Sequence, residues 1–172
     1  PHQSSNLEKF DLNNVLNREY NLGVFSWTPD VASNTLIGTF NLPDVFLNIP
    51  FIKEKTNDFM KFRSGFRINV RVSSTQFCYG TLLLYWVPNP SLDNFSAHTT
   101  LQRASGYDHR IVSASAGNVA TLDIPFVSPK RFVQSNSFVS TELGQVRLYV
   151  LNPLRIAINE VETAQILVTG QL

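Results

Sequence analysis

Residues 62–90 contain two adjacent strand patterns of opposite kind, and this pairing limits the folds that the chain can adopt. Over 66–73, apolar and polar residues alternate, which predicts a strand with one face in a core and one polar face. Over 82–87 the chain reads LLLYWV, which predicts a strand that is covered on both faces. One face would meet the core, and the other would meet a helix, an arm or another subunit.

Further short strand patterns follow one another along the chain. Within 34–43, Leu36, Phe40 and Leu42 are expected on one side. With little helix between them, about eight such strands predict an all-β fold, and eight strands in one domain suit an antiparallel jelly-roll β-sandwich. The other patterns, bounded by Pro, Asn, Ser or Gly, lie at 22–28, 109–117, 118–129, 145–154 and 164–172.

Helical signals are short. The best candidate starts at Pro50, because proline suits the first turn of a helix, and it runs toward Phe62 with Ile52, Phe59 and Met60 on one face. A second helical turn is possible near 97–105. Residues 1–21 have sparse apolar side chains and are interpreted as an N-terminal arm or a short helix, with the jelly roll over 22–172.

Composition limits the class of function. The 172 residues suffice for one domain with a real core. Charged residues make up 16%, against a usual value of about 25%, which fits a subunit packed against neighbours. The net charge of +1, with no basic run at either end, disfavours nucleic-acid binding by a cationic arm. No apolar run approaches the roughly 18 residues of a membrane span.

Chemistry-bearing motifs are scarce. The histidines His2, His98 and His109 lack metal-ligand spacing, so we expect no cofactor. No nucleophile elbow, Walker A loop or dinucleotide fingerprint occurs, so we expect no enzyme. Catalytic triads assemble from residues far apart in sequence, and no feature of this chain selects one. The single cysteine, Cys78, excludes an internal disulfide and is interpreted as a buried structural thiol.

Two groups of side chains carry alternative binding interpretations. Arg63, Arg67 and Arg71 give one strand a cationic side, which could contact RNA phosphates, the acids of a neighbouring subunit or a receptor, or could be a salt-bridged face. The aromatic residues could instead stack on sugars in a lectin, although on strands of a sandwich they are more often core or interface. These aromatic residues are Phe25, Trp27, Phe40, Tyr85 and Trp86.

Several stretches of the chain together carry a resemblance to a known family. The first is Arg63-Ser64-Gly65-Phe66, then Phe77-Cys78-Tyr79-Gly80, then the apolar strand from Leu83 to Pro88. Similar stretches are WTPDVASNTLIGTFNLPD at 27–44, ATLDIPFVSPKRF at 120–132 and GQVRLYVLNPL at 144–154. Taken together, these stretches resemble the capsid proteins of picornaviruses and their insect and other picorna-like relatives. The resemblance covers most of 22–172 and implies eight jelly-roll strands. They would lie near 22–28, 35–42, 62–74, 79–87, 109–115, 119–126, 145–151 and 164–171.

The resemblance implies a structural function rather than a catalytic one. The leading hypothesis is a major capsid protein of a non-enveloped, positive-strand RNA virus. It would assemble with related jelly-roll subunits into an icosahedral shell around the genome, in the virion and, during assembly, in the host cytoplasm. A host receptor is a further possible partner. The alternatives are a jelly-roll carbohydrate-binding module that uses Trp27, Tyr85 or Trp86, and an enzyme on a cupin-like jelly roll, which needs clustered histidines.

Overall fold

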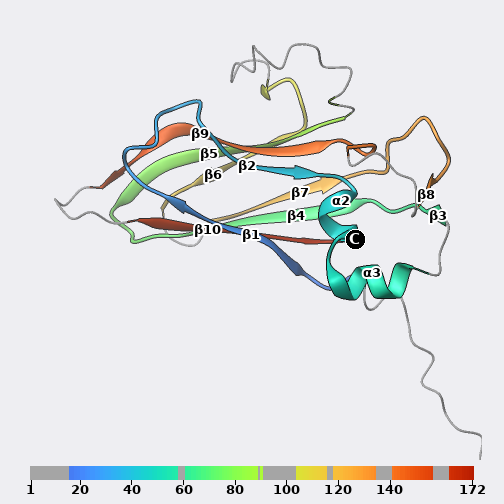
Figure 1. Cartoon of the computed structure of the whole chain (residues 1–172). Coiled ribbons are helices and arrows are strands. Elements are labelled where there is room, and N and C mark those ends of the chain that lie inside the picture. Colours follow the sequence, from blue (N-terminus) through green and yellow to red (C-terminus); the bar gives the residue numbers. More distant parts are fainter. Residues whose placement is uncertain are drawn as a thin grey trace, which may run out of the picture.

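A computed structural model of the protein describes residues 16–57, 61–88, 90, 104–115, 118–134, 141–156 and 163–172. In these residues, eight strands form two four-stranded sheets that lie face to face (Figure 1). Every strand pair in the two sheets is antiparallel. The predicted eight-stranded antiparallel jelly-roll sandwich is therefore confirmed.

Each sheet combines strands from distant parts of the chain. The first sheet has the order β1-β10-β4-β7, and the second sheet has the order β2-β9-β5-β6. The first sheet consists of β1 (Tyr20–Trp27), β10 (Ala164–Gln171), β4 (Phe66–Ser73) and β7 (Val119–Ile124). The second consists of β2 (Leu36–Asn41), β9 (Gln145–Ile156), β5 (Cys78–Val87) and β6 (His109–Ser113).

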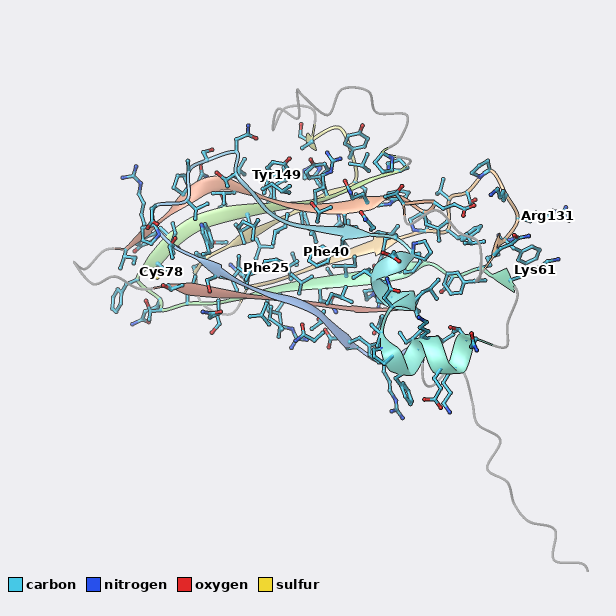
Figure 2. The ribbon with its side chains drawn as sticks, viewed as in Figure 1. Phe25, Phe40, Lys61, Cys78, Arg131 and Tyr149 are labelled. Atoms are coloured by element: carbon cyan, nitrogen blue, oxygen red, sulfur yellow. The ribbon has the colours of Figure 1, made fainter. Side chains whose placement is uncertain are left out.

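Smaller elements lie at one end of the sandwich, which we call the helix end. Helices α2 (Asp44–Leu47) and α3 (Pro50–Thr56) follow β2, and β3 (Lys61–Phe62) pairs with β8 (Val133–Gln134) (Figure 1). The start of β5 lies at the opposite end, which we call the turn end, as the position of Cys78 in Figure 2 shows.

The core fills the space between the two sheets, and the alternating pattern of β4 is confirmed. In β4, Ile68 and Val70 are fully buried, whereas Arg67 and Arg71 on the other face are exposed. The strands β7, β9 and β10 likewise place a set of apolar side chains in the core. These side chains belong to Ala120, Leu122 and Ile124, then Val146, Leu148 and Val150, then Ala164, Ile166 and Val168. A side chain of this kind contributes about 1.5–3 kcal/mol when buried.

Strand β2 departs from its predicted alternation. Phe40 and Leu42 are buried, but Leu36 is 45% exposed, so the prediction of one shared face is wrong for Leu36. The pairing of β2 with β9 shifts between Leu36 and Gly38, which is a β-bulge. One extra residue in a strand transfers everything before it to the opposite face.

The helix prediction is confirmed in part. Helix α3 begins at Pro50, and its Ile52 is fully buried, but it ends at Thr56. The predicted inward residues Phe59 and Met60 lie outside the described residues. The preceding helix α2 was not predicted, because four residues are too few to show a helical period. It carries the buried Phe46, whose ring stacks on that of Phe66 at 5.2 Å between centroids.

Two predicted segments lie largely outside the description. Most of the interpreted arm, residues 1–15, is not described. Strand β1 begins at Tyr20, so its first two residues fall within the segment assigned to the arm. Of the helical turn expected near 97–105, only residues 104–105 are described.

Candidate subunit-contact surface

The outward face of the first sheet carries the arginines singled out in the sequence. Strand β4 presents Arg67, Asn69 and Arg71 on this face, and its neighbours there are Asp123 and Thr121 of β7. We call this surface, with Glu19 and Thr169, the polar face. Because it belongs to a regular antiparallel sheet, residues directly opposite each other can interact across the strands.

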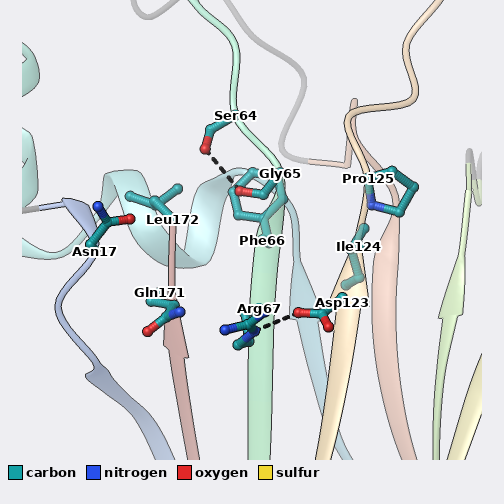
Figure 3. A pocket seen from close by; sticks show the side chains of 10 residues that line it. All are labelled: Asn17, Ser64, Gly65, Phe66, Arg67, Asp123, Ile124, Pro125, Gln171 and Leu172. Atoms are coloured by element: carbon teal, nitrogen blue, oxygen red, sulfur yellow. Dashed lines mark hydrogen bonds and ion pairs between the residues drawn. The ribbon is translucent and has the colours of Figure 1, made fainter. Parts of the chain in front are cut away.

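Arg67 forms an ion pair with Asp123, its cross-strand neighbour (Figure 3). The Nε of Arg67 lies 2.5 Å from Oδ1 of Asp123, and this hydrogen bond raises the pKa of Arg67 above its ordinary value. The pair borders an open hollow of about 540 Å³ at the helix end, beside Gly65 and Gln171. Both side chains are about half exposed, so the pair adds little to the free energy of unfolding.

Glu19, just before β1, is hydrogen-bonded to two other strands of the first sheet, β10 and β4. Its carboxylate accepts hydrogen bonds from Thr169 Oγ1 of β10, from Asn69 Nδ2 of β4 at 2.9 Å and from Arg71 Nη2 at 3.3 Å. Asn69 in turn accepts a hydrogen bond from Thr121 Oγ1 of β7 at 2.8 Å. These partners, first Thr169 and then Asn69 and Arg71, lower the pKa of Glu19 below its ordinary value.

Arg63 does not share the polar face. It precedes β4, and its guanidinium carbon lies 5.2 Å from the ring centroid of Phe126. The structure therefore brings Arg67 and Arg71 together on one face and leaves Arg63 at the edge of the sandwich. Spacing along β4 could not reveal the acids that neutralise the two paired arginines, because Glu19 and Asp123 are each about fifty residues away in sequence.

The outward face of the second sheet is apolar in its centre. There Leu83, Tyr85 and Val87 of β5 form a second buried cluster with Tyr149 and Ala104. The ring of Tyr85 stacks on Tyr107, which is partly buried against this cluster, at 6.2 Å between centroids. Burial raises the pKa of Tyr85. The predicted double coverage of the strand is thus present, and Ala104 and Tyr107 of the same chain supply part of the cover.

Apolar side chains cross all four strands of the second sheet in one row. Tyr149 pairs with Leu36 on one side and with Leu83 on the other, and Leu83 pairs with Ile111. The two middle residues are buried, whereas Leu36 and Ile111 at the two edges are 45% and 56% exposed. Exposed apolar side chains of this kind often mark contacts with other proteins.

The remaining candidate residues have structural environments. Cys78 is buried, as predicted, with its Sγ 3.4 Å from Thr75 Oγ1. His109 Nδ1 lies 2.9 Å from the carbonyl oxygen of Tyr107, while His2 and His98 lie outside the described residues. Within the described ranges, no three His, Cys, Asp or Glu side chains are grouped so as to hold a metal ion. Among the same residues, no helix is long and apolar enough to cross a membrane.

Comparison with known families identifies the class of this sandwich. The family model of the picornavirus capsid protein matches residues 8–141. This chain belongs to the picornavirus capsid protein family. It is a structural capsid protein of a picorna-like RNA virus, because both its family and its fold are those of capsid subunits.

Curated relatives of this capsid protein are viral polyproteins. The chain is 26% identical over 153 residues to the genome polyprotein of Human parechovirus 5 (strain CT86-6760), and 25% identical over 179 residues to that of Deformed wing virus. These alignments cover 88% and 92% of the chain. The chain spans only 7% and 6% of the lengths of the two polyproteins.

Solved structures of viruses share the capsid fold. The structure of black queen cell virus matches with a TM-score of 0.83 and 23% identity, over 98% of this chain and 73% of the other. The Triatoma virus empty capsid matches with a TM-score of 0.82 and 23% identity, over 93% and 89%. The structure of Mud Crab Dicistrovirus matches with a TM-score of 0.83 and 23% identity, over 99% of this chain and 75% of the other.

The lectin alternative does not fit this capsid protein. Its proposed stacking residues Trp27, Tyr85 and Trp86 are 0%, 1% and 8% exposed, so none presents a ring face to a sugar. Their positions explain the error, because Trp27 and Trp86 belong to the core between the sheets and Tyr85 to the second buried cluster.

Proposed function

We propose that this chain assembles with related jelly-roll subunits into an icosahedral shell, which encloses the genome of a non-enveloped, positive-strand RNA virus. The observation that carries the proposal is the family match over a sandwich with two four-stranded jelly-roll sheets. The low share of charged residues, 16%, supports it, because a subunit surrounded by neighbours needs less charged surface. The chain would reside in the virion, and in the host cytoplasm during assembly.

We also propose that the polar face contacts a neighbouring subunit rather than RNA. Arg67 and Arg71 already hold acids, so the face offers little net positive charge to phosphates. Their remaining N–H donors and the hydrogen-bonded row of polar side chains suit a protein surface of complementary polarity. Arg63, with its guanidinium on Phe126, would contribute at the edge of this contact.

Co-expression with the companion capsid proteins tests both proposals. We expect shells by electron microscopy and a fast-sedimenting species. A folded chain that stays monomeric with its companions present under all assembly conditions would contradict the assembly proposal.

The double variant Arg67→Ala/Asp123→Ala tests the polar face, because it removes an ion pair without changing the net charge. We expect it to lower the yield of shells. The matched control Glu54→Ala/Lys55→Ala removes the weaker pair on α3, 3.8 Å apart, and should leave the yield unchanged. Equal yields from both variants would contradict the polar face as a contact.

A further inference from the structure

A shallow hollow on the second sheet has no role in the shell proposed above. It lies at the turn end of the sandwich, next to Cys78 of Figure 2, and has a volume of about 480 Å³. Its walls come from three strands, β5, β6 and β9. The residues that matter for its chemistry are Tyr79, Thr81, Ser113, Asn152, Pro153 and Arg155.

The hollow exists because β9 carries extra residues opposite β5. Their register shifts twice, between Tyr79 and Thr81 and again between Thr81 and Leu82. Bulges of this kind bend a strand and redirect its side chains, and Pro153, which has no N–H to donate, lies in the bulged stretch. Gly80 lets β5 pack closely on the core, since a Cβ at this position would lie only 2.7 Å from the ring of the fully buried Trp27.

A row of hydroxyl and amide groups crosses the hollow. Asn152 Nδ2 donates a hydrogen bond to Thr81 Oγ1 at 2.8 Å, and Ser113 is the cross-strand neighbour of Thr81. This bond leaves Asn152 Oδ1 as an acceptor and the Thr81 hydroxyl as a donor for a ligand. The hydroxyl of Ser113 continues the row to that of Ser115, 3.0 Å away.

An aromatic ring and a cation stand beside this row. Tyr79 and Arg155 are direct cross-strand partners, so their side chains share a face, and Tyr79 is 59% exposed. In the part of the chain that the structure describes, Arg67, Arg71 and Arg110 each pair with a carboxylate, whereas Arg155 has no acidic partner. Arg155 also borders a second hollow of about 500 Å³, together with Pro153, Pro29 and Val31.

We propose that this hollow binds an acidic sugar. The carboxylate of the sugar pairs with the guanidinium of Arg155, which can donate two parallel hydrogen bonds. The apolar face of its ring packs on Tyr79, and its hydroxyls exchange hydrogen bonds with Asn152 and Thr81. A neighbouring sugar unit occupies the second hollow, along Pro153. A nucleic acid fits less well, because its phosphates call for clustered cations and Arg155 is the one cation in the walls described.

Binding of 3′-sialyllactose to the full chain, measured by titration calorimetry, tests the proposal, with lactose as the neutral control. We expect binding of sialyllactose and not of lactose. The variants Arg155→Ala and Tyr79→Ala should each weaken it by about tenfold or more. The control Arg131→Ala removes an exposed cation near the helix end (Figure 2) and should change nothing. Thermal melts of each variant check that it is folded.

Three outcomes would overturn the proposal. The first is no sialyllactose binding, or equal binding of lactose. The second is unchanged affinity in folded Arg155→Ala, or an equal loss in Arg131→Ala, since either shows that Arg155 is not the specific partner. The third is equally tight binding of a single-stranded RNA oligonucleotide, which would indicate a general anion surface. The test uses the isolated chain, so its result is separate from that of shell assembly.

Discussion

The two sheets of the sandwich have the same number of strands but opposite outward faces. The polar face of the first sheet is held together by side-chain hydrogen bonds that start at Glu19 and end at Thr121. The outward face of the second sheet is instead completed by a second apolar layer, in which Tyr85 is almost fully buried.

This difference shows two ways of finishing a sheet on the side away from the core. Polar side chains can satisfy one another and remain in contact with water, so they need no cover. Apolar side chains gain free energy only when further residues remove them from water, about 25 cal/mol per Å². Substitutions on the second sheet should therefore cost more stability than comparable ones on the first.

The largest effect is expected from Leu83→Ala on the second sheet. Leu83 is 3% exposed although it points away from the main core, so truncation leaves a cavity in the second cluster. We expect the free energy of unfolding to fall by about 2–5 kcal/mol, as measured by urea denaturation. The control Ile111→Ala, at the exposed end of the same row, should cost less than about 1 kcal/mol. Equal small costs would show that the outer layer does not exclude water.

A smaller effect is expected from Asn69→Ala on the polar face. Its amide donates to Glu19 and accepts from Thr121, so the variant loses two hydrogen bonds on a half-buried strand position. We expect a loss of about 1–2 kcal/mol in thermal or urea unfolding. Ser73→Ala, an exposed change on the same strand, serves as the control. A loss as large as that of Leu83→Ala would contradict the distinction between the two faces.

The smallest effect is a difference in pH dependence, expected from Glu19→Gln. The hydrogen bonds that lower the pKa of Glu19 below its ordinary 4.5 stabilise the folded state while the carboxylate is charged. This stabilisation is fully present above about pH 4.5 and is lost as the pH falls through the lower folded-state pKa. Melting temperatures from about pH 7 to about pH 3 should therefore fall less steeply for the variant than for the wild type.

The matched control for this comparison is Glu54→Gln on α3, whose side chain is 73% exposed. It should follow the wild-type profile. Parallel profiles for wild type and Glu19→Gln would show that Glu19 does not hold the strands together.

Much of the fold could be predicted because side-chain period and burial agree along most strands. Alternation over 66–73 predicted which face of β4 enters the core, and the apolar run over 82–87 predicted that β5 is covered twice. Both signals depend only on residues within the strand, so they can be recognised in the sequence. The exposed Leu36 could not be predicted, because a bulge depends on pairing with β9 rather than on the residues of β2.

Proline misled the prediction for β9. The strand was expected to end at 151 or 154, but it continues to Ile156. In this last part β9 pairs with β5 alone, and bulges there accommodate Pro153, which has no N–H to donate. The same bulges create the hollow beside Arg155. The sequence also predicted only part of the polar face, the arginines of β4. Their acidic partners, Asp123 and Glu19, lie in other parts of the chain.

The strand order has a consequence for the time at which this protein can fold. The strands that join the two halves of each sheet, β10 between β1 and β4 and β9 between β2 and β5, are the last two to be synthesised. Until they leave the ribosome, the earlier strands of these two sheets can form only the pairs β4–β7 and β5–β6, with their apolar faces uncovered. The sandwich must therefore remain incompletely folded until β9 and β10 have been synthesised, and that interval is when aggregation competes most strongly with folding.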